Sequence, residues 1–151
     1  MNDGKLTPAK LRACIPYECS KGKYLQLPFC SIYETQLDNR IASGFGTGFL
    51  FVPGNEQGTP PKYPFLIHAI SALVSQPYTY MRIQWPDGHY LSNVPVDIWS
   101  MMQTGRNGRL LERPEFTEPG DVIRMEFGTQ RGTEIPVLVK IHFEGCILIP
   151  Q

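Results

Sequence analysis

The side chains that bind metals most readily, histidine and cysteine, are few in this sequence. The three histidines, His68, His89 and His142, form neither an H-x-H nor an H-E-x-x-H pattern. A cupin-like metalloenzyme would need a His-x-His pair with a carboxylate and a later histidine, so this class loses its main support. We predict that His142, on the same strand face as Lys140 and Glu144, is a solvated surface residue. His68 lies inside an apolar run and is predicted to be a hydrogen-bonded core residue.

The four cysteines, Cys14, Cys19, Cys30 and Cys146, leave three interpretations open. They form a four-thiolate zinc site if the fold brings them together, or two of the first three form a disulfide. Otherwise they are free thiols, which is the state that we expect. The start of the chain is polar and basic and lacks the apolar stretch of a secretory signal, which favours assembly in a reducing cytosol. We therefore expect no metal and no cofactor.

Three further patterns that would indicate catalysis are incomplete. Gly44–Gly48 (Gly-Phe-Gly-Thr-Gly) has neither the G-x-G-x-x-G spacing nor the Gly-Lys-Ser/Thr ending of a phosphate-binding loop, so a bulge or close backbone packing is predicted there. A G-x-S-x-G nucleophile elbow does not occur. A glycosidase would need two carboxylates facing across a groove. The candidates lie in or near predicted turns and comprise Asp87, Asp97, Glu112, Glu115 and Glu118. The sequence therefore indicates a protein that is not an enzyme.

Aromatic side chains gather around one predicted hairpin. Tyr78, Tyr80 and Tyr90 lie on or beside it, with Trp85 and Trp99 nearby. Such a row can stack on sugar rings or fill a subunit interface. For any one of these residues, ordinary cross-strand packing is the favoured alternative.

Alternating apolar and polar residues are the main structural signal in this sequence. In residues 134–149 the alternation predicts a strand with one buried and one solvated face. Its apolar side comprises Ile135, Val137, Val139, Ile141 and Phe143. Residues 78–85 alternate in the same way, and Pro86-Asp87-Gly88 predicts a tight turn into a returning strand over residues 89–96. Phe65–Ser75 fits a helix or a strand, and we favour a strand because its neighbours are β.

Length and composition set the class of the molecule. A chain of 151 residues with 42% hydrophobic residues predicts a single globular domain. The net charge is zero and no basic stretch occurs, which disfavours nucleic-acid binding, and no apolar run is long enough for a membrane helix. We predict an N-terminal arm over residues 1–22 and an all-β domain over residues 23–151. Some eight strands with frequent turns indicate an antiparallel β-sandwich, for which a jelly roll is our first choice.

The order of these segments resembles one family, the jelly-roll decoration or cement proteins of tailed-phage capsids. The resembling stretch covers most of residues 28–146. Its parts are Pro28-Phe29, the apolar strand near 65–74, Tyr80–Ser92, Val94-Pro95-Val96, Arg113–Asp121 and Val137–Gly145. The glycine-rich residues 44–48 and the four cysteines depart from the family's pattern.

This resemblance implies a non-enzymatic virion protein that assembles in the host cytoplasm and sits on the capsid surface. It would form a homo-oligomer, expected to be a trimer, and would clamp neighbouring major capsid proteins through several interfaces of roughly 1,000 Å² or more. Expected interface residues are Leu6 and Leu11 of the arm, the tyrosines Tyr78, Tyr80 and Tyr90, and the basic residues Arg106, Arg109 and Arg113. The arginines would pair with acidic capsid loops, or are simply solvated loop charges. Direct contact with nucleic acid or a membrane is not expected.

Two other functions remain as alternatives. A carbohydrate- or receptor-binding β-sandwich, as in a phage tail, predicts an exposed aromatic platform surrounded by acid or amide groups. A cupin-like metalloenzyme predicts two or three histidines within metal-ligand distance, about 2 Å, of one ion.

Overall fold

The computed structural model describes residues 15–19, 22–37, 47–55, 57–92, 94–103, 109–129 and 136–151. The elements in chain order are β1 (Ile15–Cys19), β2 (Gly22–Leu37), β3 (Thr47–Phe51), β4 (Phe65–Val74), β5 (Thr79–Gln84), β6 (Val96–Asp97), α2 (Ile98–Gln103), β7 (Arg109–Thr117), β8 (Ile123–Thr129) and β9 (Val137–Pro150). The protein is therefore all-β, as the alternation predicted.

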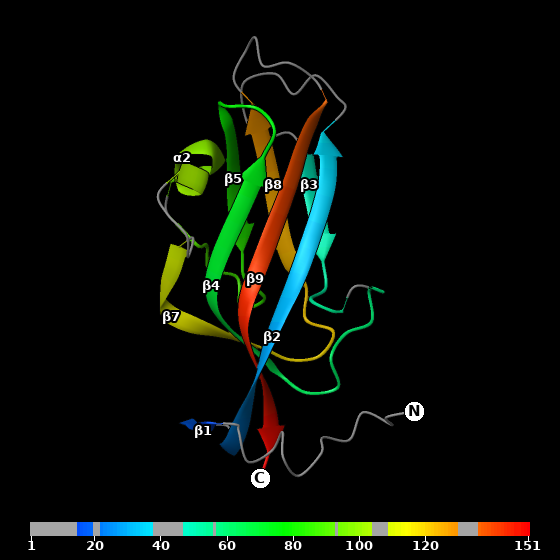
Figure 1. The fold of residues 1–151 in the computed structure, drawn as a ribbon, viewed down its shortest axis with the longest axis vertical. Helices are drawn as coiled ribbons and strands as arrows, with labels where there is room; N and C mark the ends of the chain where they lie inside the picture. The colour runs from blue at the N-terminus through cyan, green and yellow to red at the C-terminus, as the bar shows by residue number, and fades with distance from the viewer. Residues whose placement is uncertain are drawn as a thin grey trace.

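Two antiparallel sheets pack face to face. One has five strands in the order β1-β2-β9-β4-β7, and the other has four in the order β3-β8-β5-β6. Figure 1 shows β2, β9 and β4 in front of β3, β8 and β5, with α2 beside the sandwich and the lower ends of β2 and β9 extending beyond it. The predicted antiparallel β-sandwich is confirmed.

The strands pair in a nested way along the chain. β2 pairs with β9, β3 with β8, β4 with β7 and β5 with β6. Two further pairings, β4 with β9 and β5 with β8, join these ribbons into sheets. The central position of β9 is notable, because it is hydrogen-bonded to β2 along its whole length and to β4 along most of it.

The hydrophobic core lies between the sheets and is rich in aromatic rings. Phe143 of β9 is fully buried, stacks on Phe51 at 5.5 Å between centroids and meets Trp85 edge-on at 6.2 Å. Burying a side chain of this size stabilises a fold by about 1.5–3 kcal/mol. The alternation of β5 supplies further core residues, since Thr79, Met81, Ile83 and Trp85 are all buried as predicted.

The apolar run at residues 65–74 is a strand, which settles the choice between helix and strand. Phe65, Ile67 and Ile70 of β4 all point into the core. The step from Ile67 to Ile70 breaks the alternation because the register shifts between Ile67 and Ala69.

A short helix, α2, was not predicted. Asp97 caps it, because its carboxylate accepts hydrogen bonds from the Ser100 backbone N–H at 3.3 Å and the Ser100 hydroxyl at 3.1 Å. Ile98 and Met101 of the helix are buried in the core. Six residues are too few to display a helical period, so the cap was the only signal in the sequence.

The predicted hairpin at residues 78–96 forms only in part. The turn is present, with the Gly88 N–H donating to the Trp85 carbonyl at 2.9 Å and Gly88 at φ 98°. The segment that returns after the turn makes one isolated bridge with β5, between Gln84 and Tyr90. Regular pairing with β5 resumes at β6, Val96–Asp97. Pro95 has no N–H to offer to a ladder, which disfavours a continuous strand here.

The other predictions fall partly on described residues. The turn predicted near Glu118 is confirmed, because the Asp121 N–H donates to the Glu118 carbonyl at 3.0 Å. Within the predicted arm, residues 15–19 form β1, which pairs with the start of β2. Residues 1–14, most of the glycine-rich segment 44–48 and residues 104–108 lie outside the described residues.

Candidate functional site

The outer face of the five-stranded sheet carries the most varied chemistry among the described residues. On β9 the odd-numbered residues from Val137 to Phe143 are buried, so the even-numbered residues from Leu138 to Glu144 face outward. The register places Glu34 of β2 beside Lys140 and Leu73 of β4 on its other side. Three strands therefore contribute to one continuous outer face.

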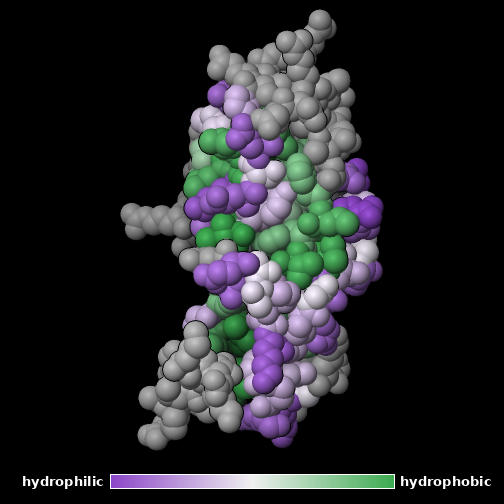
Figure 2. All heavy atoms as spheres, turned by 90° about the vertical axis from the view of Figure 1, so that its right-hand side faces the viewer, coloured by the Kyte–Doolittle hydropathy of each residue, from purple (hydrophilic) through white to green (hydrophobic). Residues whose placement is uncertain are grey.

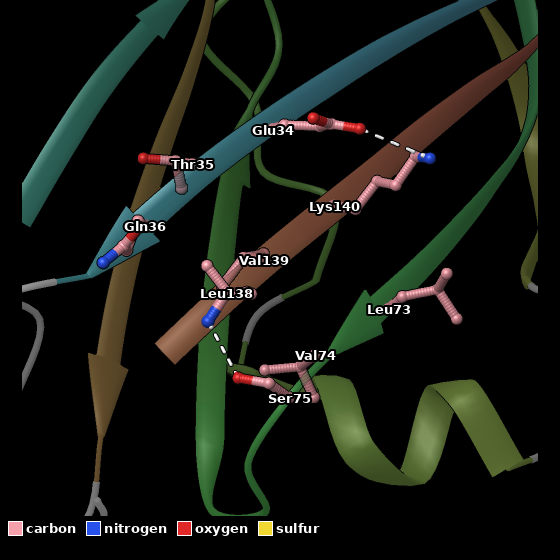
Figure 3. A pocket seen from close by; sticks show the side chains of 9 residues that line it. All are labelled: Glu34, Thr35, Gln36, Leu73, Val74, Ser75, Leu138, Val139 and Lys140. Carbon is pink, nitrogen blue, oxygen red and sulfur yellow. Dashed lines mark hydrogen bonds and ion pairs between the residues drawn. The ribbon is translucent and has the colours of Figure 1, made fainter. Parts of the chain in front are cut away.

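A hollow of about 540 Å³ occupies one end of this face (Figure 3). It is lined by residues 34–36 of β2, residues 73–75 at the end of β4 and residues 138–140 of β9. Lys140 Nζ lies 3.3 Å from Glu34 Oε1, and the Leu138 N–H donates to Ser75 Oγ at 2.9 Å. Two exposed apolar side chains, Leu73 and Leu138, belong to the same lining.

The lining of this hollow suits binding better than catalysis. Among the described residues that line it, Glu34 is the one carboxylate, and it is already paired with Lys140. General acid–base chemistry on a glycosidic bond would need a second carboxylate across the groove. The exposed leucines instead offer apolar area to a partner.

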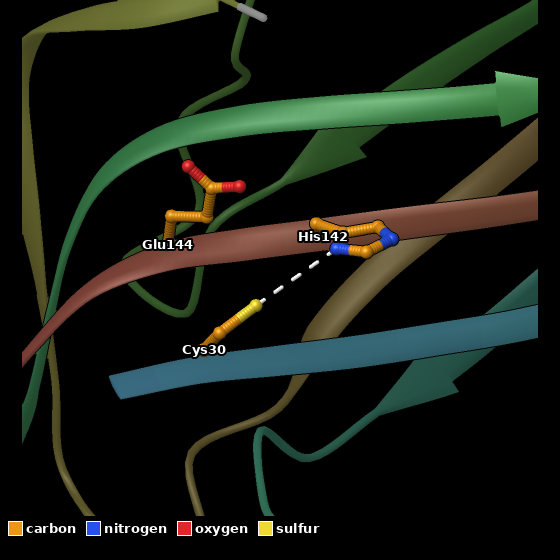
Figure 4. A group of neighbouring side chains, drawn as sticks. All are labelled: Cys30, His142 and Glu144. Atoms are coloured by element: carbon orange, nitrogen blue, oxygen red, sulfur yellow. Dashed lines mark hydrogen bonds between the residues drawn. The ribbon is translucent and has the colours of Figure 1, made fainter. Parts of the chain in front are cut away.

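A cluster of three potential ligands lies further along the same face. Cys30 and Glu144 are register partners on β2 and β9, and His142 is two residues from Glu144 on the same side of β9. One ligand atom from each residue lies within 4.8 Å of the other two, and Cys30 Sγ is 3.9 Å from His142 Nδ1. Figure 4 shows the thiol directed at the imidazole, with Glu144 beside them. Partial burial, and then the charge of Glu144, raise the pKa of the Cys30 thiol.

A second cluster joins the two sheets. His89, just after the Pro86-Asp87-Gly88 turn, makes an ion pair with Asp87 through Nδ1 and lies 2.6 Å from Glu115 Oε1 of β7 through Nε2. Each ring nitrogen of His89 contacts a carboxylate, so neither is available to a metal ion. The cluster instead links the turn to β7. Partial burial raises the pKa of Glu115, while the hydrogen bond and charge of His89 lower it.

The predicted aromatic row is not assembled as one platform. Trp85 is buried in the core, and Tyr80 and Trp99 are half-buried. Tyr78 and Tyr90 are exposed, but Tyr78 precedes β5 and Tyr90 pairs with Gln84 at its other end. Six strand residues separate these positions by roughly 20 Å.

The other predicted interface residues are placed only in part. Arg113 is exposed on β7, and Arg109 begins that strand. Leu6, Leu11 and Arg106 lie outside the described residues. Tyr90, in contrast, has a clear contact, because the Arg82 guanidinium lies over its ring at 4.7 Å from the centroid.

Sequence reasoning missed the Cys30 cluster and the hollow. Alternation does place His142 and Glu144 on one face, which was the available signal. It cannot bring Cys30 to them, because 112 positions separate Cys30 from His142. Neither Cys30 nor Cys146 forms a disulfide, in agreement with the expected thiol state, and the side chains of Cys14 and Cys19 lie outside the described part.

A second apolar surface lies on the side of the molecule where β2 and β3 are neighbours. Figure 2 shows hydrophobic side chains gathered in the middle of this side, between hydrophilic ones. The exposed Leu50 lies on β3, whereas the exposed Ile32 of β2 pairs with His142 and so lies on the outer face of the five-stranded sheet. Within the described residues β2 pairs with β1 only as far as Gln26, so from Leu27 to Leu37 it forms the edge of its sheet.

No helix in the described part of the chain has the length and apolar character needed to cross a membrane. Comparison with family models, with curated proteins and with solved structures found no match to this chain.

Proposed function

We propose that this protein is a non-enzymatic structural protein that attaches to a protein shell as a homo-oligomer, and that it decorates the capsid of a tailed phage. The observation that carries the proposal is the presence of two separate exposed apolar surfaces on one rigid sandwich. The outer-face surface contains Ile32, Leu73 and Leu138, which are 41%, 51% and 54% exposed, and the edge surface, at β3, contains Leu50, at 69%. A protein that joins its own copies and also a shell needs at least two such surfaces.

We assign the edge surface to self-association. An edge strand presents backbone groups that can pair with another strand, and here apolar side chains accompany them. We assign the outer-face surface to the shell, because the hollow between β2, β4 and β9 can receive a protruding side chain. Repeated weak contacts of an oligomer then add to a high apparent affinity.

The strand order supports a jelly roll as the specific form of the sandwich. The eight strands from β2 to β9 form one long ribbon that is folded back on itself. The first strand, β2, pairs with the last, β9, and the second, β3, pairs with the seventh, β8. They form two four-stranded layers, β2-β9-β4-β7 and β3-β8-β5-β6, and β1 extends the first. Two Greek keys wound in this way define a jelly roll.

The rival functions find less support in the described residues. A carbohydrate-binding module would use an aromatic platform, but Tyr78 and Tyr90 are far apart and Trp85 is buried. A cupin-like enzyme would gather histidines, but each of the two ligand clusters contains a single one.

Binding of the purified chain to expanded, undecorated phage capsids tests the proposal. Wild-type protein should co-sediment with the shells, and Leu138→Asp should weaken this by at least about tenfold, because a charge would be placed in an apolar contact. Val94→Asp is the matched control: Val94 is 65% exposed but belongs to neither surface, so binding should persist. Failure to bind any shell, together with binding to glycans, would overturn the proposal in favour of a carbohydrate-binding module.

A further inference from the structure

The cluster of Cys30, His142 and Glu144 has the ligand types of a zinc site. Zinc is bound in proteins by thiolate sulfur, imidazole nitrogen and carboxylate oxygen, and sites open to solvent have three protein ligands. One atom of each kind is present here, on two adjacent strands, with all three atoms within 4.8 Å of one another.

The separation of the sulfur and nitrogen ligands is close to that which a tetrahedral ion requires. Zinc–sulfur and zinc–nitrogen distances of about 2.3 and 2.05 Å at a tetrahedral angle place the two ligand atoms about 3.6 Å apart. Cys30 Sγ and His142 Nδ1 are 3.9 Å apart, so a movement of a few tenths of an ångström suffices. Small rotations of the exposed Cys30 and Glu144 side chains can supply it.

The strands hold these side chains in place. Cys30 and Glu144 are directly opposite each other, where side chains lie about 5 Å apart, and β9 is paired on both sides. Ser71 of β4 lies 3.5 Å from Glu144 Oε1 through its hydroxyl, which can orient the carboxylate. Such outer contacts of a ligand strengthen metal binding.

We propose that Cys30, His142 and Glu144 bind one zinc ion on the outer face of the five-stranded sheet, with the fourth coordination position open to water. A nucleophilic cysteine is the competing use of the same residues. It is disfavoured because partial burial, and then the charge of Glu144, raise the pKa of the thiol, whereas a nucleophile needs a stabilised thiolate. A divalent ion reverses this balance, since its charge favours the thiolate.

Titration of the reduced, full-length protein with cobalt(II), a spectroscopic substitute for zinc, tests the site. One equivalent should produce the near-ultraviolet charge-transfer band of a cobalt–thiolate bond, and zinc should displace it. Competition with a chromophoric chelator should show zinc binding at least about tenfold weaker in Cys30→Ser, His142→Gln and Glu144→Gln. Far-ultraviolet circular dichroism should confirm that these exposed or half-buried substitutions leave the fold intact.

Cys146→Ser is the matched control, because Cys146 is a second cysteine, on β9 with His142 and Glu144, and lies outside the cluster. Its zinc affinity should equal that of the wild type. Three results would overturn the proposal: cobalt binding without a thiolate band, unchanged zinc affinity in Cys30→Ser, or equal loss in Cys146→Ser, which would indicate a site built from cysteines alone.

Discussion

Glu115 shows how one side chain can serve the fold at an energetic cost. Its carboxylate holds His89 at 2.6 Å and so ties the turn after β5 to β7 of the opposite sheet. Burial nevertheless outweighs this contact and raises the pKa of Glu115 above its ordinary value of 4.5. The folded state therefore holds the proton more tightly than the unfolded chain does. The protonated Glu115 carboxyl therefore contributes stability that is fully present below the ordinary pKa and is lost as the pH rises through the folded-state pKa.

This sign leads to a pH-dependent prediction. Glu115→Gln removes the titration, so the free energy of unfolding of the variant should rise relative to that of the wild type as the pH increases above 4.5. Urea unfolding at a series of pH values from acidic to neutral measures this difference. Glu112→Gln, an exposed position on the same strand, controls for the loss of one negative charge. A difference that falls with rising pH would show that the ion pair with His89 dominates instead.

At the scale of elements, the contact between β4 and β9 depends on a residue without a side chain. At Gly145 the chain of β9 approaches β4 beside the register shift between Ile67 and Ala69. A Cβ atom at position 145 would lie 1.8 Å from the Leu66 carbonyl oxygen. Because this neighbour is backbone, rotation of a side chain cannot relieve the overlap, and the two strands would have to separate.

Gly145→Ala should therefore destabilise the protein by about 3 kcal/mol or more, at or beyond the upper end of usual overpacking costs. Gly88→Ala is a useful comparison, because its Cβ meets nothing within 4 Å although its φ is 98°. That change should cost only the strain of a left-handed backbone, about 1–2 kcal/mol. Chemical denaturation measures both values, and an equal or smaller cost for Gly145→Ala would contradict the steric account.

The elements also show where sequence reasoning succeeds and where it ends. Strict alternation identified the strands around Met81 and Ile141, because one residue in two must face the core. It did not identify α2, which is too short for a helical period, nor the break after Tyr90, which depends on how β6 returns to β5. The Cys30 cluster and the hollow depend on the register of strands far apart in the chain, which no local pattern contains.

For the whole molecule, the proposed association rests on the arrangement of the apolar surfaces. Leu50 lies on β3, on the side formed by the β2 and β3 edges, whereas Ile32, Leu73 and Leu138 lie on the outer face of the larger sheet. Because these surfaces are separate, self-association and attachment to a shell should respond to different substitutions.

Light scattering tests this separation in solution. The wild type is expected to be a trimer, Leu50→Asp should lower its mass to that of a monomer, and Leu138→Asp should leave the trimer intact. The charge at position 50 would have to be buried in the association, which costs several kcal/mol when it is unpaired. A wild-type protein that stays monomeric at high concentration would contradict the assignment of the edge surface, and dissociation by Leu138→Asp alone would reverse the two roles.

The position of β9 has a consequence for biosynthesis. β9 is synthesised after the other strands of the sandwich described above, yet it is the strand that joins β2 to β4. Until Val137–Pro150 has emerged, β2 and β4 lack the strand that lies between them. Their unpaired edges are then open to pairing with other chains. The pairing of β2 with β9, which lie far apart in the sequence, is also intrinsically slow. We therefore expect the yield of native protein to depend on chaperones and on slow translation more than on the strength of the finished core.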